Sequence, residues 1–173
     1  MSAKAKIALI FAICAAPIVL ATAAYLLGWK GHAGNYGELV PPRQLQAPAF
    51  KALRGKWVLV TFDAAACGKP CEDKLYVVRQ VRRAQGANAE RIERLWLLTD
   101  NGKPRAELLA AIEGSRVEPA AQAGELREFP GDRLQYIYLV DPLGNLMMRY
   151  PAAPDPAKMI HDLERLLKVS RVG

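Results

Sequence analysis

The chain has 173 residues, with 24 basic and 17 acidic side chains and a formal net charge of +7 at pH 7. That length allows one domain plus an anchor. Basic and aromatic residues do not alternate as they do in nucleic-acid-binding proteins, so we expect no nucleic-acid partner.

The N-terminal segment is predicted to anchor the chain in a membrane. Ile7 to Trp29 contains no charged side chain and is long enough to span a hydrocarbon core of about 30 Å as a helix. Lys4 and Lys6 precede it, and positive charge usually stays on the cytoplasmic side. We therefore expect a single-pass transmembrane anchor over residues 1–30, with everything after it exported.

Two other interpretations of this segment remain open. A cleaved signal peptide would use the small residues Ala21 to Ala23, but Tyr25 to Leu27 extend the apolar run beyond that site. A lipoprotein signal ending at Cys14 is disfavoured because the large Ile13 precedes the cysteine. Cys14 is interpreted as a small apolar residue of the membrane helix.

A linker is predicted over residues 31–51, where glycines give way to prolines and apolar periodicity is weak. His32 lies in this segment and is interpreted as a membrane-interface residue. The globular domain is expected to occupy residues 52–173.

A strand, a loop and a helix at the start of this domain carry the chemistry. Trp57 to Phe62 is apolar and β-prone, as in a strand that is covered on both faces. Cys67 and Cys71 follow, and helical periodicity then runs to about Gln85. A helix N-terminus favours thiolate over thiol and so lowers a cysteine pKa below about 8.5. Such a dithiol can exchange disulfides or hold a soft metal ion, although a purely structural disulfide is the plain alternative.

The rest of the domain is predicted to complete an α/β fold. Glu90 to Arg94 is polar, and Ser115 to Gly131 is irregular. The predicted elements are a buried strand at Leu95 to Thr99, a turn at Asp100 to Gly102, a short helix at Pro104 to Glu113, a strand at Tyr136 to Val140, a hairpin turn at Asp141 to Asn145, a returning strand at Leu146 to Tyr150, and a helix capped by Asp155. This order predicts a thioredoxin-like, three-layer α/β domain behind the transmembrane helix.

Two further features are interpreted conservatively. The arginines that cluster after the cysteine helix favour a solvated face near anionic lipid headgroups over a docking patch for an acidic partner; they are Arg79, Arg82, Arg83, Arg91 and Arg94. His161 lies beside the apolar stripe of the last helix and is interpreted as a boundary residue rather than a ligand.

The cysteine segment and the hairpin together resemble the Sco family of cytochrome c oxidase assembly proteins. The shared features are Gly55 to Phe62, the three-residue spacing between Cys67 and Cys71, and Tyr138 to Asn145. The resemblance covers roughly residues 52–168. It implies a thioredoxin fold, an anchor in a bacterial inner membrane with the domain in the periplasm, and a partner in cytochrome c oxidase subunit II, whose copper centre the family helps to build. It also implies that Cys67 and Cys71 are the family's cysteine pair.

The chain departs from the family at the positions that decide between two chemistries. Sco-like proteins bind copper through two cysteines and a histidine, or act as thiol-disulfide reductases. The family histidine follows an aspartate, but here Arg133 follows Asp132, and arginine cannot ligate a metal. The family prolines after the two cysteines are replaced by Gly68 and Glu72.

Thiol-disulfide exchange is therefore expected, with Cys67 as the attacking thiolate and Cys71 as the resolving thiol. Arg133 or Lys69 would stabilise the thiolate. A Cu(I) chaperone that uses the two thiolates and a non-catalytic assembly scaffold remain the alternatives. Met147 or Met148 would have to replace the histidine in a copper site, but methionines in a strand favour a place in the core.

Overall fold

The structure is a computed structural model that describes residues 2–27, 34–120, 127–170 and 172. The chain divides into two compact units, Met1–Gly34 and Asn35–Gly173. Two residues discussed above, Trp29 and His32, lie outside the described residues.

The first unit is the helix α1, Ala3–Leu26. Ser2 caps it by accepting a hydrogen bond from the backbone N–H of Ala5. None of its side chains is buried. At 1.5 Å per residue its 24 residues extend about 36 Å. The helix is thus long and apolar enough to cross a membrane.

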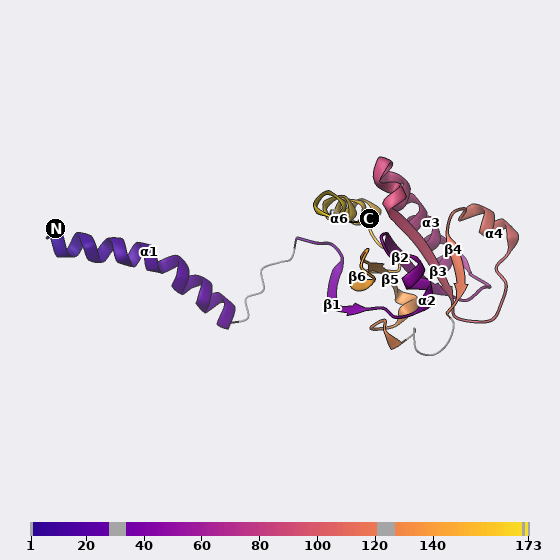
Figure 1. Cartoon of the computed structure of the whole chain (residues 1–173), viewed down its shortest axis with the longest axis horizontal. Helices are drawn as coiled ribbons and strands as arrows, with labels where there is room; N and C mark the ends of the chain where they lie inside the picture. Colours follow the sequence, from indigo (N-terminus) through magenta and orange to yellow (C-terminus); the bar gives the residue numbers. More distant parts are fainter. Residues whose placement is uncertain (1, 28–33, 121–126, 171, 173) are drawn as a thin grey trace. The chain divides into compact units, whose positions relative to one another are not determined.

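The second unit is built on one six-stranded mixed sheet with the strand order β1-β6-β5-β2-β3-β4 (Figure 1). Its strands are β1 (Glu38–Gln44), β2 (Trp57–Asp63), β3 (Ile92–Leu98), β4 (Arg116–Pro119), β5 (Tyr136–Val140) and β6 (Asn145–Pro151). β2 pairs in parallel with β3 and antiparallel with β5. This central position explains why six of its seven residues are buried.

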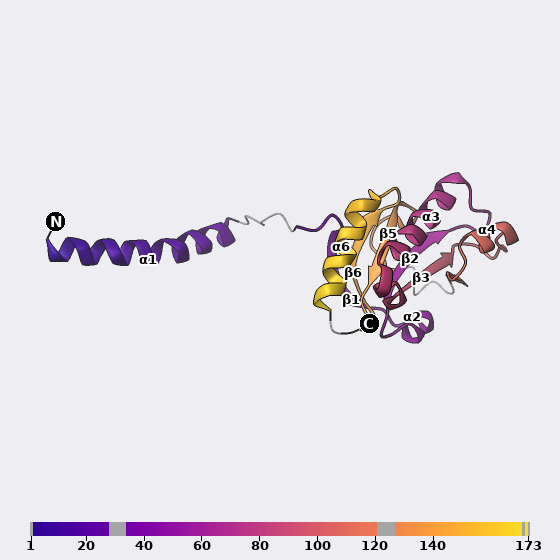
Figure 2. The ribbon, with the colours of Figure 1, turned by 90° about the horizontal axis from the view of Figure 1, so that it is seen from above.

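Helices cover both faces of the sheet, which gives the three layers expected from the sequence. The helices are α2 (Pro48–Ala52), α3 (Lys69–Ala84), α4 (Ala106–Ala111) and α6 (Pro156–Val169), with short 3-10 turns η1 (Gly86–Arg91) and η2 (Arg133–Gln135). On one face α3 and α6 lie side by side (Figure 2) and pack with Leu59, Ile137 and Leu139. On the other face, Phe50 of α2 joins Phe62 and Phe129 in an aromatic cluster.

The strongest local signals are confirmed within a residue or two. β5 has the predicted bounds, and the hairpin turn before β6 contains Gly144 at φ +88°, a conformation that disfavours residues with a Cβ. Asp155 caps α6 by accepting hydrogen bonds from the N–H groups of Ala157 and Lys158. α3 ends at Ala84, one residue before the predicted end.

The structure differs from the predicted linker at its C-terminal part. Residues 31–51 were expected to be a tether, but β1 and α2 fall within residues 38–52 and belong to the folded unit. β1 pairs with β6 at one edge of the sheet. An edge strand tolerates Pro41 and Pro42, because one side of it needs no ladder hydrogen bonds.

Three further boundaries differ from the prediction, two of them because of strand pairing. β3 begins at Ile92, inside the segment interpreted as polar, because it pairs along its whole length with β2. β4 forms inside the segment interpreted as irregular, by pairing with β3. α4 is shorter than the predicted helix, and its N-cap is Arg105.

Candidate functional site

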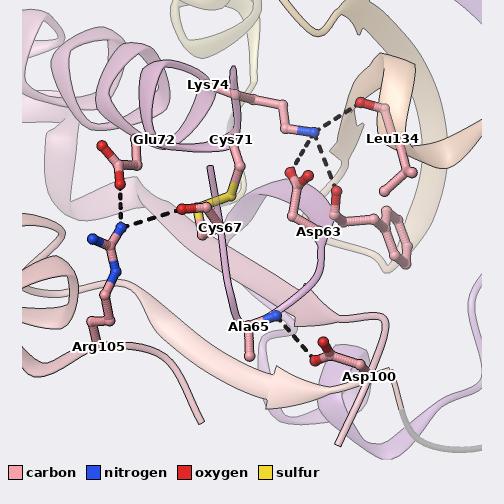
Figure 3. Close-up of a disulfide and its surroundings, with 10 residues drawn as sticks. Asp63, Ala65, Cys67, Cys71, Glu72, Lys74, Asp100, Arg105 and Leu134 are labelled. Atoms are coloured by element: carbon pink, nitrogen blue, oxygen red, sulfur yellow. Dashed lines mark hydrogen bonds and ion pairs between the residues drawn. A yellow bond between two sulfur atoms is a disulfide. The ribbon is translucent and has the colours of Figure 1, made fainter. Parts of the chain in front are cut away.

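The two cysteines predicted to act together are joined by a disulfide where β2 leads into α3 (Figure 3). The strand ends at Asp63 and the helix begins at Lys69, so a five-residue loop carries Cys67. Cys71 is the third residue of α3. The Cα atoms of Cys67 and Cys71 are 5.3 Å apart, within the usual range for disulfides.

The turn that follows β3 holds this loop in place. The Ala65 N–H donates to Oδ1 of Asp100 at 3.0 Å, and the same carboxylate oxygen accepts from the Gly102 N–H. A Cβ on Gly102 would lie only 2.7 Å from the Ala65 side chain. Glycine is therefore required for this close approach. The segment Asp100-Asn-Gly102 both forms the turn after β3 and holds the cysteine loop in place.

The backbone at Cys67 is held in an unusual conformation. Its φ of +33° makes it the only non-glycine residue with positive φ in the described part of the chain. Gly68 is the N-cap of α3 and forms no side-chain capping bond. The first N–H groups of α3 and the positive end of its dipole are thus directed towards the cysteine loop.

Both cysteines are buried in the disulfide form. Cys67 is 3% exposed and Cys71 is 5% exposed, and they pack with Leu75, Trp96 and Leu108. Exposure therefore does not separate the attacking from the resolving cysteine. Two hollows flank the first turns of α3, of about 640 Å³ beside Pro70 and Val77 and about 240 Å³ beside Tyr76, and neither is lined by a cysteine.

A cation that sequence reasoning missed contacts the cysteine loop. Arg105 Nη2 donates to the carbonyl oxygen of Cys67 at 3.2 Å and forms an ion pair with Glu72, the residue after Cys71. Lys69, which was expected to support the thiolate, instead forms an exposed ion pair with Asp73. Because 38 residues separate Arg105 from Cys67, no local pattern in the sequence links them.

A second missed feature is a buried ion pair one helical turn beyond Cys71. The Lys74 side chain is 2% exposed, and its Nζ lies 2.6 Å from Oδ2 of Asp63. The same ammonium donates to the carbonyl oxygens of Phe62 and Leu134. Burial raises the pKa of Asp63 above its usual value, and the contact with Lys74 opposes this shift. In the sequence, Lys74 lies on the apolar stripe of its helix, and this position is the pattern that indicates a buried lysine.

Arg133 lies in η2, immediately before Leu134, whose carbonyl accepts from Lys74. The segment that carries Arg133 therefore meets α3 one turn after Cys71. The expectation that Arg133 itself supports the thiolate stays a prediction.

In its disulfide form the cysteine pair offers no thiolate to a copper ion. The two sulfur atoms are bonded to each other. Across residues 2–27, 34–120, 127–170 and 172, no group of three or more histidine, cysteine, aspartate or glutamate side chains is placed to hold a metal. Met148 is buried with Leu59 and Ile137, in a cluster separate from the cysteines, and His161 is exposed on α6.

Solved structures of thioredoxin-like proteins share this fold at low sequence identity. Copper-bound yeast Sco1 is 18% identical with a TM-score of 0.57, over 70% of this chain and 84% of that one. BsSco, described as having a disulfide switch, is 17% identical with a TM-score of 0.53, over 79% and 97%. The peroxidoxin BcpB of Mycobacterium tuberculosis is 16% identical with a TM-score of 0.51, over 79% and 98%.

A search of curated protein sequences gave no match. A family described as "Transmembrane-like, thioredoxin-like, C-terminal domain" matches residues 57–170, which include β2, the cysteine pair and α6. The structural likeness to Sco proteins agrees with the family that the cysteine spacing and the hairpin resemble. The chain therefore belongs to the family of transmembrane-like, thioredoxin-like C-terminal domains, and its folded unit is a thioredoxin-like domain with the Sco fold.

Proposed function

We propose that this chain is a membrane-anchored, Sco-like thiol-disulfide oxidoreductase that assists assembly of the copper centre of cytochrome c oxidase. The observation that carries the proposal is the Cys67–Cys71 disulfide at the start of α3. BsSco, which has a similar fold, is described both as a cytochrome c oxidase assembly protein and as having a disulfide switch.

The exchange runs through a mixed disulfide. In the reductive direction the Cys67 thiolate attacks a sulfur of the partner's disulfide, forms a Cys67–partner bond and releases one partner thiolate. The Cys71 thiolate then attacks the Cys67 sulfur, forms the Cys67–Cys71 bond and releases the second partner thiolate. Two electrons pass from the cysteine pair to the partner. A separate dithiol reductant must return the pair to the reduced form.

The setting around Cys67 supports this chemistry. The N-terminus of α3 and the Arg105 guanidinium place positive charge beside the loop, and positive charge favours the thiolate that attacks. Since both sulfur atoms are buried in the disulfide form, the loop at residues 64–68 has to open when a partner thiol reaches them. Oxidase subunit II is the proposed partner, and α1 is proposed to anchor the chain in a bacterial inner membrane with the domain in the periplasm.

The decisive experiment replaces single cysteines in the full chain and measures cytochrome c oxidase activity in cells that depend on it. Cys67→Ser is expected to abolish the chain's contribution to oxidase activity. Cys14→Ser is the matched control, because Cys14 lies in α1 and outside the disulfide, and it is expected to retain that contribution. Unchanged activity with Cys67→Ser would refute the exchange mechanism.

A Cu(I) chaperone is the second candidate, because yeast Sco1 has been solved with copper bound and a reduced pair would offer two soft thiolates. The full chain, reduced and kept in uncharged detergent, is titrated with Cu(I) against a calibrated chelator. Tight one-to-one binding that disappears in Cys67→Ser would favour the chaperone. Weak binding in both proteins would favour exchange. If loss of both cysteines leaves assembly intact but loss of the domain does not, the chain is a scaffold.

A further inference from the structure

An arginine-rich region lies on the α3 face of the sheet, apart from the disulfide. At its base is Arg94, which belongs to β3 and is only 4% exposed. Side chains on this strand alternate between faces, so Arg94 shares a face with Ile92 and Trp96. A buried guanidinium normally finds a carboxylate or a full set of hydrogen-bond acceptors.

Arg94 has neither within the described residues. Its Nη2 donates to the carbonyl oxygen of Glu113 at 2.5 Å. Its Nε and Nη1 are shielded from solvent and have no hydrogen-bond partner in the described part of the chain. A guanidinium carries five N–H donors, so most of the donor capacity of Arg94 is unused. Across residues 2–27, 34–120, 127–170 and 172, no ion pair joins Arg94 to a carboxylate.

The side chains around Arg94 add positive rather than negative charge. Burial, followed by the charges of Arg82 and Arg79, lowers the pKa of Arg94 to about 10, with a smaller contribution from Arg83. The negative charge of Glu93 acts in the opposite direction and raises the pKa of Arg94. Arg94 therefore remains protonated at neutral pH, and most of the charges that act on it are positive.

The four arginines lie at different depths below the surface. Arg83 is exposed, Arg79 and Arg82 are half-buried, and Arg94 is buried beneath the turn at Glu113 and Gly114. Arg82 Nε donates to the carbonyl oxygen of Ile92 at 2.7 Å. This hydrogen bond fixes the Arg82 side chain against β3. Arg91, the other arginine of the sequence cluster, is not part of this group, because it donates to the carbonyl oxygens of Leu167 and Ser170 at the end of α6.

We propose that Arg79, Arg82, Arg83 and Arg94 form a phosphate-binding site. A phosphate group supplies several acceptor oxygens and negative charge, and arginine is the side chain best suited to both. The group would meet Arg83 and Arg79 first. These long side chains would then have to move aside before an oxygen reaches Arg94. Two kinds of ligand carry such a phosphate group: a free phosphate compound, and the headgroup of an anionic phospholipid.

The test is thermal unfolding of the full chain in uncharged detergent micelles, with inorganic phosphate titrated against chloride at equal ionic strength. A ligand that binds the folded state raises the midpoint as its concentration rises. Phosphate also stabilises proteins non-specifically, so variants are compared. Arg43→Met is the matched control, because Arg43 is exposed on β1 and outside the arginine group.

The expected result is a phosphate-dependent rise in midpoint for the natural chain and for Arg43→Met that is absent in Arg94→Met. Arg83→Gln, which changes an exposed side chain, is expected to weaken phosphate binding by about tenfold, as loss of one charge-assisted hydrogen bond would. If Arg94→Met does not fold, Arg83→Gln alone tests whether the arginines bind phosphate. Equal phosphate responses in all four proteins would overturn the site as a free-phosphate site.

A second arm identifies the source of the phosphate. The micelles are doped with phosphatidylglycerol, and the same four proteins are compared. Stabilisation by the doped micelles but not by inorganic phosphate, lost in Arg83→Gln and in Arg94→Met, would assign the site to a lipid headgroup. Stabilisation by inorganic phosphate would assign it to a free phosphate compound. No variant-dependent response in either arm would refute the proposal.

Discussion

Lys74 and Arg94 are both buried cations on the same face of the sheet, but their surroundings differ. The Lys74 ammonium donates to two backbone carbonyl oxygens and forms an ion pair with the carboxylate of Asp63. Among the described residues Arg94 donates to a single carbonyl oxygen, and the charges of three other arginines act on it. Burial of a charge costs several kcal/mol unless partners offset it. The first site is therefore internally complete, whereas the second is built for an anion that comes from outside.

The largest effect is expected at Asp63, because its loss leaves a buried ammonium without its carboxylate. Asp63→Leu should lower the free energy of unfolding by about 3 kcal/mol, at the lower end for a broken buried pair because Asp63 is 17% exposed. Urea unfolding of the full chain in micelles measures this. Asp73→Leu breaks the exposed pair with Lys69 and should cost about 0.5 kcal/mol or less. If both variants cost the same, Lys74 does not depend on its carboxylate partner.

The next prediction contrasts the two cations directly. Lys74→Met leaves the acceptors of Asp63, Phe62 and Leu134 without their donor, and should cost about 2 kcal/mol. Arg94→Met removes a charge that has little compensation, and should be neutral or stabilising by about 1 kcal/mol in phosphate-free buffer. Unfolding in urea at matched salt provides both values. A cost for Arg94→Met as large as that for Lys74→Met would mean that Arg94 is already satisfied by the fold.

Asp63→Asn keeps a side-chain oxygen that Asp63→Leu removes, but it carries no negative charge. This variant therefore tests the contribution of the Asp63 charge alone. The folded-state pKa of Asp63 lies above its unfolded value, so the folded chain binds the proton more tightly than the unfolded chain does. As pH falls through the folded pKa towards the unfolded one, the natural chain should therefore gain stability relative to Asp63→Asn. Unfolding curves of both proteins between about pH 3.5 and 7 measure the difference. A difference that stays constant, or that changes in the other direction, would contradict the raised pKa.

The sequence predicted the elements with strong local signals and missed those that depend on pairing. β2 is an uninterrupted apolar run, and α6 begins with an Asp-Pro cap, so both were predicted closely. β1 exposes every residue except Val40 and contains two prolines. Only its pairing with β6 makes it a strand, and no local pattern records that pairing.

The same division applies to the site. The spacing of Cys67 and Cys71 and the helix after them identified the two cysteines as a pair, because this pattern is local in sequence. Arg105 reaches the loop from the N-cap of α4, 38 residues along the chain, and Arg94 becomes buried only when the chain packs around it. Long-range contacts of this kind determine which charges surround a dithiol, and composition and spacing do not report them.

The smallest effect is expected at the exposed pair beside the disulfide. Arg105 favours the Cys67 thiolate, whereas Glu72 neutralises Arg105, so their removal should act in opposite directions. Arg105→Gln should slow alkylation of the reduced chain by iodoacetamide at pH 7, and Glu72→Gln should accelerate it. Each change should be about twofold, because the side chains are 56% and 38% exposed and solvent screens the pair. A merely structural clamp would make both variants change in the same direction, since either one breaks it.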